Sequence, residues 1–135
     1  MAFFEWKEEY SVNIKEIDQQ HRKLVALLND LYEALKRGEG KEALGTILSG
    51  LLAYTKTHFA AEERLMKTHD YPDYPLHKEK HERMTTRVLE YVSKFEAGKI
   101  RSPIEISTFI KDWLQKHILQ TDMNYSAYLN SKGVH

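Results

Sequence analysis

The sequence contains no cysteine, only three prolines, no excess of either charge and no long apolar run. Without cysteine the chain has no disulfide, no thiolate metal site and no cysteine nucleophile. Lysine and arginine together number 20, and aspartate and glutamate also number 20, so the formal net charge is zero. A neutral chain offers no general electrostatic attraction to nucleic acid or to an anionic membrane, and we expect neither as a partner.

The chain also lacks apolar segments of the kinds that direct a protein to a membrane or through it. The first ten residues, MAFFEWKEEY, carry acids where a signal peptide needs an unbroken apolar stretch. No apolar run approaches the length of a membrane span. Together with the missing cysteines, this composition suits a reducing compartment, and we expect a cytoplasmic protein.

With 135 residues the chain has the length of one domain, which can bury a core without disulfides. Four segments carry apolar residues at helical spacing, and short breaks separate them. The predicted helices run from about 18 to 37, 41 to 67, 74 to 97 and 103 to 120. We therefore expect an all-α protein, in which residues 1–135 form an up-down-up-down antiparallel four-helix bundle.

Local signals mark the ends of these helices. Asp18 is a suitable N-cap for the first helix, and Gly38 stops it. Two prolines in the segment 70–75 separate the second helix from the third. The sequence SPIE at 102–105 is a capping box that begins the fourth helix. Residues 1–17 carry apolar side chains without helical spacing, so we expect an extended N-terminal arm packed along the bundle.

Each predicted helix places at least one histidine on its apolar face. On the first helix His21 stands among leucines spaced three and four residues apart, and His117 continues the apolar face of the fourth. The second helix carries His58 together with Glu62. Residues four apart on a helix share one face, and the third helix has two histidines at that spacing. We expect these side chains to converge in the core.

A single inward histidine is usually a core residue that is hydrogen-bonded to a hydroxyl or a carbonyl. Five inward histidines with carboxylates need more partners than this, and few lysines or arginines point inward. First-row divalent metals prefer imidazole nitrogen and carboxylate oxygen as ligands, so we interpret the set as a metal centre with no catalytic acid or base. The predicted ligands are His21, His58, Glu62, His77, His81, His117 and Asp122. We expect His69 and His135 to be exposed and outside the site.

The number of donors favours two metal ions over one. Five imidazoles and two bridging carboxylates supply five nitrogens and four oxygens. A solvent-derived oxo or hydroxo bridge adds one donor to each ion, which leaves the pair one donor short of two octahedra. A small exogenous ligand would bind at that open position. The ligand types alone admit manganese, cobalt and zinc as well as iron.

The spacing of the last two ligands requires an irregular helix. His117 and Asp122 are five residues apart, which is about 140° around a regular α-helix, so they cannot face one site from it. A π-bulge or a break would restore their alignment. We therefore predict an irregularity between Ile118 and Thr121.

The pattern as a whole resembles that of the hemerythrin family, in its single-domain bacterial form. The matching motifs are a lone histidine on the first helix, then His-x-x-x-Glu, His-x-x-x-His and His-x-x-x-x-Asp, in that order. The segment VNIKEIDQQH at 12–21 also fits, and the resemblance covers nearly the whole chain.

The resemblance implies a non-haem di-iron centre, bridged by an oxo or hydroxo group, that binds O2 reversibly. It also implies that NO and small anions such as azide bind at the same open iron. The implied division of ligands is His77, His81 and His117 on a six-coordinate iron, His21 and His58 on the iron with the open position, and Glu62 and Asp122 as bridges.

An apolar pocket for O2 is expected beside the irons. Trp113 and Leu114 precede His117 by four and three residues and therefore lie on the same side of the helix. Phe59 and Ile118 are neighbours of ligand histidines in the sequence. In the family, the position three before the fourth-helix histidine lines the O2 pocket, which favours Leu114. The alternative is that all four are core residues and no more.

Other classes of protein are alternatives to an O2 carrier, storage or delivery protein. A ferritin-type oxidase or iron-storage protein would carry Glu-x-x-His pairs, and a metallohydrolase would carry His-Glu-x-x-His, but neither motif occurs. A di-iron sensor of O2, NO or redox state would need a separate output partner. A helical interaction protein without metal would leave five inward histidines unexplained. We expect an O2-binding protein that is not an enzyme; a weak oxidase-like activity is the alternative that stays open.

Overall fold

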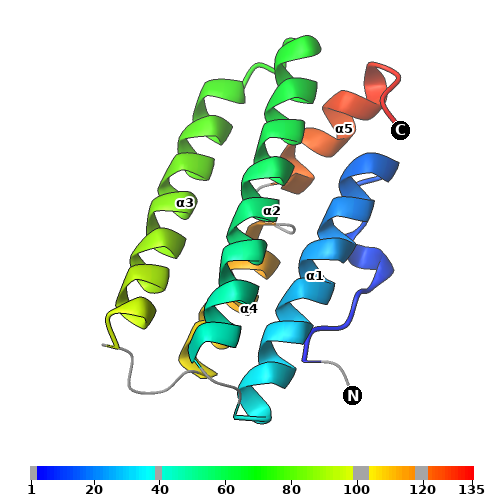
Figure 1. Cartoon of the computed structure of the whole chain (residues 1–135). Helices are drawn as coiled ribbons and strands as arrows, with labels where there is room; N and C mark the ends of the chain where they lie inside the picture. Colours follow the sequence, from blue (N-terminus) through cyan, green and yellow to red (C-terminus); the bar gives the residue numbers. More distant parts are fainter. Residues whose placement is uncertain (1–2, 39–40, 99–103, 118–121) are drawn as a thin grey trace.

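The computed structural model describes residues 3–38, 41–98, 104–117 and 122–135. Its bundle is built from α1 (Lys15–Lys36), α2 (Lys41–Thr68), α3 (Tyr74–Glu96) and α4 (Ile104–Lys116), which run alternately up and down (Figure 1). A shorter helix, α5 (Met123–Ser131), follows α4 and extends the fourth column of the bundle (Figure 1). The predicted all-α bundle is confirmed. No helix within the described ranges is long and apolar enough to span a bilayer.

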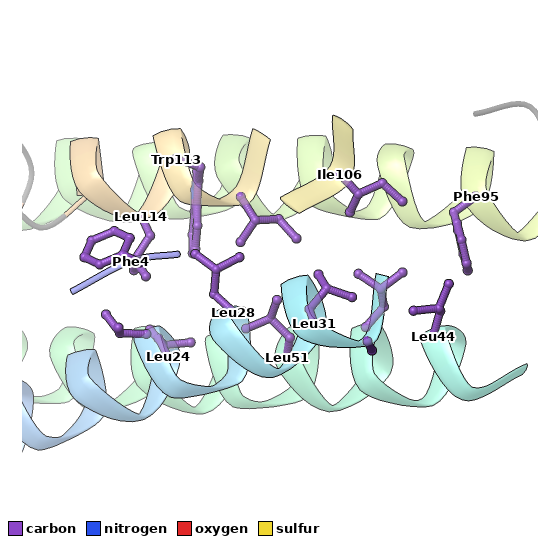
Figure 2. Close-up of a cluster of buried hydrophobic side chains, with 14 of the residues drawn as sticks. Phe4, Leu24, Leu28, Leu31, Leu44, Leu51, Phe95, Ile106, Trp113 and Leu114 are labelled. Carbon is purple, nitrogen blue, oxygen red and sulfur yellow. The ribbon is translucent and has the colours of Figure 1, made fainter. Parts of the chain in front are cut away.

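Neighbouring helices close the bundle into a ring. α1 packs against α2 and α4, and α3 packs against the same two helices, while α5 contacts α2. Side chains from the helices and from the N-terminal arm fill the space between them (Figure 2). We call this set the large apolar cluster; it comprises Phe4, Tyr10, Leu24, Val25, Leu28, Leu31, Ala34, Leu44, Leu48, Leu51, Phe59, Phe95, Ile106, Ile110, Trp113 and Leu114.

A second, smaller core lies toward the start of α1 and the end of α2. It gathers residues from the arm, α1, α2, the loop before α3, and α5. We call it the small apolar cluster; it comprises Val12, Ile14, Ile17, Met66, Tyr71, Tyr125 and Leu129. Burial of this apolar surface, at about 25 cal/mol per Å², holds the arm and α5 to the bundle.

The N-terminal arm packs along the bundle as predicted, but it is shorter than residues 1–17. A single turn of 3-10 helix, η1 (Glu8–Tyr10), interrupts it, and α1 begins at Lys15. The predicted N-cap at Asp18 is therefore wrong, since this residue lies inside α1. Its carboxylate instead accepts hydrogen bonds from Ser11 Oγ at 2.5 Å and from the Val12 amide at 2.8 Å, which anchors the arm to the helix.

The remaining helix ends agree with the sequence signals except in the fourth column. Gly38 and Gly98 have φ of 68° and 70°, a conformation that glycine adopts without strain as it ends α1 and α3. The fourth helix was predicted over about 103–120 with an irregularity near its end. In the structure α4 ends at Lys116, and the prediction missed α5. Burial of Tyr125 and Leu129, four residues apart, holds α5 in place. The start of the predicted capping box lies outside the described residues.

Candidate metal centre

The seven predicted ligands come from all four columns of the bundle and meet in its interior. His21 lies on α1, and α2 contributes His58 and Glu62 one turn apart. α3 contributes a second pair one turn apart, and the last two residues follow α4 and precede α5. All seven are buried. The residues brought together are His21, His58, Glu62, His77, His81, His117 and Asp122.

His117 and Asp122 reach one site although a regular helix would separate them. His117 directly follows α4 and Asp122 directly precedes α5, and both residues are π-helical. The Nε2 atom of His117 lies 2.8 Å from Oδ2 of Asp122, so the two side chains reach the same site. The irregularity was predicted at residues 118–121, which lie outside the described residues.

The two carboxylate oxygens of Asp122 face different histidines. Oδ2 lies 2.6 Å from His21 Nε2 and 3.5 Å from His58 Nε2. Oδ1 lies 3.4 Å from His77 Nε2 and has no hydrogen-bond partner among the described residues. A carboxylate held in this way presents one oxygen to each of two neighbouring cation positions.

Glu62 approaches the same space from α2. Its Oε1 lies 2.7 Å from His58 Nε2, 3.2 Å from His117 Nε2 and 3.6 Å from His81 Nε2. Its Oε2 accepts a hydrogen bond of 2.5 Å from the hydroxyl of Tyr125, which is completely buried. The sequence analysis did not identify Tyr125, although its spacing of three residues from a predicted ligand was a usable signal.

The ligand atoms form two groups that share both carboxylates. Within each group, one nitrogen or oxygen of every residue lies within 4.8 Å of the others. The inner group comprises His21, His58, Glu62, His117 and Asp122. The α3 group comprises Glu62, His77, His81 and Asp122. Each of the two groups fits a metal ion, and the groups have Glu62 and Asp122 in common.

The grouping of His117 differs from the one that the resemblance implied. Its Nε2 lies 3.1 Å from His58 Nε2, so His117 joins the inner group, whereas the resemblance placed it with the α3 histidines. The ring of His117 is nevertheless 5.6 Å from that of His81 and 5.2 Å from that of His58, measured between centroids. It stands between the two groups, and two imidazoles remain on either side of it.

The polar atoms of the site are suited to a cation. The Nε2 atoms of His77 and His81 are buried without a hydrogen bond in the described part of the chain. An unpaired buried polar atom costs about 1–3 kcal/mol, and bound metal would satisfy these nitrogens together with Oδ1 of Asp122. No lysine or arginine is among the buried residues that the structure describes, so no fixed cation neutralises the two carboxylates. The cluster therefore fits a metal site.

The pKa values of the two carboxylates are shifted in opposite directions. Burial alone would raise the pKa of Glu62, but the imidazoles of His58 and His117 outweigh it and hold that pKa well below the usual 4.5. Burial raises the pKa of Asp122 well above the usual 3.8, and the charge of Glu62 adds to this rise. One carboxylate therefore favours the ionised form and the other retains a proton, as expected for two acids in one buried site.

The pKa values of the histidines are shifted in opposite directions. Burial lowers the pKa of His77 to about 4 and that of His81 to about 2, from a usual value of 6.5. Burial and the neighbouring His58 also lower the pKa of His21 well below this value. For His58 the effect of burial is outweighed by Glu62, so its pKa is raised. The histidines of α3 are thus neutral and ready to bind metal over a wide pH range.

Three of the four residues expected to line a pocket lie in the large apolar cluster. The ring of Phe59 stacks on His81 with centroids 3.9 Å apart, and that of Trp113 stacks on His117 at 5.6 Å. Leu114 is 1% exposed. Ile118 lies outside the described residues.

Two further residues contact ligand histidines and were missed by the sequence analysis. Gln20 is hydrogen-bonded to His58, and Glu63 to His81. Both immediately adjoin a predicted ligand in the sequence, but adjacency alone does not predict which histidine each would reach. Of the two histidines expected outside the site, His135 is exposed and His69 is half-buried.

Comparisons with known proteins agree with this geometry. Residues 12–129 match the family model described as the hemerythrin HHE cation binding domain. The chain is 37% identical over 134 residues to the bacteriohemerythrin of Stenotrophomonas maltophilia (strain R551-3), covering 96% of this chain and 86% of that protein. It is 30% identical over 132 residues to the bacteriohemerythrin of Methylococcus capsulatus (strain ATCC 33009 / NCIMB 11132 / Bath), covering 97% and 100%.

Solved structures lead to the same result. A crystal structure of wild-type hemerythrin has a TM-score of 0.87 and 29% identity, and the alignment covers 95% of this chain and 98% of that one. A hemerythrin mutant has a TM-score of 0.88 and 28% identity, with coverage of 96% and 98%. The resemblance inferred from the ligand motifs is confirmed, and the chain belongs to the hemerythrin family.

Proposed function

We propose that this protein binds O2 reversibly at a non-haem di-iron centre. The observation that carries the proposal is the pair of buried histidine groups that share Glu62 and Asp122. Two ions held side by side, each with imidazole ligands and with carboxylates in common, form the arrangement that this site would hold best. A bound di-iron pair would supply the electrons and the open coordination position for O2.

The roles of the protein residues follow from their positions. We assign the five histidines and two carboxylates named above as the metal ligands. Glu62 and Asp122 serve as bridges, because each faces histidines of both groups. Phe59, Trp113 and Leu114 form apolar walls that keep water from the centre, with Leu114 as the residue nearest to bound O2. A dry surround slows the loss of electrons to solvent.

No protein group is required as an acid or base in this function. Among the described buried residues, the ionisable side chains at the site are the proposed ligands themselves and Tyr125, whose hydroxyl is engaged by Glu62. This composition supports O2 binding for carriage, storage or delivery over catalysis of a hydrolysis. We extend the proposal to NO and azide as competing ligands of the open position.

Iron analysis and a visible spectrum test the proposal. The purified protein should contain about two irons per chain, as its two ligand groups require. On exposure of the reduced protein to air, a charge-transfer band should appear in the visible and should disappear when O2 is removed. Direct oxidation to the ferric form without a reversible species would refute O2 carriage and favour a sensor or oxidase. A single zinc per chain would refute the di-iron assignment.

A further inference from the structure

Two of the proposed ligand histidines form a hydrogen bond through Nδ1, the ring nitrogen that faces away from Glu62 and Asp122. His58 Nδ1 lies 2.7 Å from Oε1 of Gln20, and His81 Nδ1 lies 3.0 Å from Oε2 of Glu63. Both partner atoms are oxygens that accept hydrogen bonds, so each Nδ1 carries the proton and donates it. This tautomer leaves the Nε2 lone pair free for a metal, and it fixes the orientation of the ring.

The two partners differ in charge although glutamine and glutamate have nearly the same shape. The inner group has a neutral amide behind His58, whereas the α3 group has a carboxylate behind His81. The ring nitrogens of His21 and His117 at the same position have no hydrogen-bond partner in the described part of the chain. Among the described hydrogen bonds to the Nδ1 atoms of ligand histidines, the one from His81 to Glu63 is therefore the one whose acceptor is charged.

A carboxylate acceptor changes the histidine more than an amide does. It draws the Nδ1 proton away from the ring more strongly, which raises the electron density at Nε2 and makes the imidazole a better donor to a cation. Glu63 is suited to this role, because its side chain is 24% exposed while the imidazole it contacts is 2% exposed. The carboxylate therefore keeps contact with water while its effect is transmitted into the buried site.

We propose that Glu63 and Gln20 are positioning residues that make the two metal positions unequal. Glu63 strengthens binding of the ion held through His81, and Gln20 orients His58 without adding charge. The inference rests on the proposed two-metal function and deepens it. Exchanging the two residues would move the charge from one metal position to the other at constant net charge.

Titration of the metal-free protein with Co2+ tests this inference, followed by visible absorption and calorimetry. We expect Glu63→Gln to weaken one of the two binding steps by about 10-fold or more and to leave the other within about twofold. Gln20→Glu should tighten one step. In the double variant Gln20→Glu/Glu63→Gln, both changes should appear together. Glu82→Gln removes a neighbouring carboxylate that borders the same surface cavity as Glu63, and it should leave both steps unchanged.

A second measurement separates this role from a general effect on folding. In the Zn2+-loaded protein, the Nδ1–H resonance of His81 should move in Glu63→Gln and stay in place in Glu82→Gln. Native-like Co2+ binding in Glu63→Gln, equal weakening of both steps, or weakening in Gln20→Glu would each overturn the inference while leaving the two-metal function intact. If the native chain binds fewer than two Co2+ ions, the proposed function itself fails, and the inference fails with it.

Discussion

The inner group and the α3 group share two carboxylates but differ in their surroundings. The histidines of the inner group are completely buried, with exposed fractions of 0%. Those of the α3 group border the surface: His81 lines a cavity of about 400 Å³, and His77 lines another of about 370 Å³. The difference indicates that one bundle can hold two chemically similar positions at different distances from solvent. The α3 group is therefore the one that lies nearer to solvent.

The two groups also differ in how they hold protons. In the α3 group the histidine pKa values are about 4 and about 2, so both imidazoles are neutral at physiological pH. In the inner group the pKa of His58 is raised above 6.5, since Glu62 stabilises the charged ring. As the pH falls, metal binding to the inner group therefore competes with protonation of His58 before any such competition begins at the α3 group, whose histidines stay neutral. Four predictions test this contrast.

The largest effect is expected from removal of a residue that both groups share. Glu62→Gln keeps the size of the side chain but removes its charge, so both positions lose a bridge. We expect the metal content to fall from about two ions per chain to less than one, measured by elemental analysis. The control Glu90→Gln changes an exposed carboxylate on α3 and should retain both ions. A Glu62→Gln protein with two ions would exclude Glu62 as a required bridge.

Removal of a histidine that belongs to one group should have about half of that effect. His58→Ala should empty the inner position and His81→Ala the α3 position, so that each variant retains about one ion per chain. Elemental analysis measures the content, and His135→Ala, at an exposed site, should match the native protein. Loss of both ions from either variant would mean that the two positions fill only together.

Lowering the pH should distinguish the groups without any mutation. Ligands must be deprotonated to bind metal, so affinity falls as pH falls through the pKa of each group in the metal-free protein. Because the pKa of His58 is raised, the inner position meets this competition first as the pH falls, and its binding weakens by about tenfold per unit of pH below that pKa. The lowered values in the α3 group leave its histidines free of this competition down to about pH 5. Protonation of Asp122 affects both groups, so Co2+ titrations at pH 8, 7 and 6 should show one step weakening more than the other. Equal weakening of the two steps would contradict the contrast.

The smallest effect is expected at a contact that stabilises the fold around both groups. Tyr125→Phe removes the hydroxyl that donates to Glu62 at 2.5 Å and leaves the ring in place. A hydrogen bond to a charged group contributes about 1.5–3 kcal/mol, so urea unfolding of the metal-free protein should show a loss of that order. The content of about two ions should persist. Tyr32→Phe, a half-buried tyrosine of α1, is the matched control.

Much of the bundle could be predicted from the sequence, because its signals are local. His21 and His58 were recognised by their places on apolar faces with steps of three and four, and such faces define helices directly. Helix α5 was missed, since it is only nine residues long and is stabilised by packing against the arm and α2. Asp18 was assigned to a cap from its residue type, but contacts with the preceding loop decide its role.

The ligands could be predicted more fully than the residues that support them. The ligands of one metal centre must all point into the same part of the core. Their spacing on the apolar faces of the helices shows which side chains can do so. The partners of a ligand depend on the rotation and separation of two helices, which one sequence does not specify. Gln20 lies on α1 yet reaches His58 on α2, and Glu63 on α2 reaches His81 on α3. The position of His117 between the groups depends on the same packing.

The contact between His21 and Asp122 joins residues 101 positions apart in the sequence at a distance of 2.6 Å. Synthesis proceeds from the N-terminus, so the histidines of α1, α2 and α3 are already part of the chain when Asp122 is added. Contacts between these histidines can therefore form before the second bridge is present. Contacts between distant residues close slowly in folding. Completion of both metal positions consequently waits for a contact of long sequence separation, and any ion captured before that contact forms is held by an unfinished set of ligands.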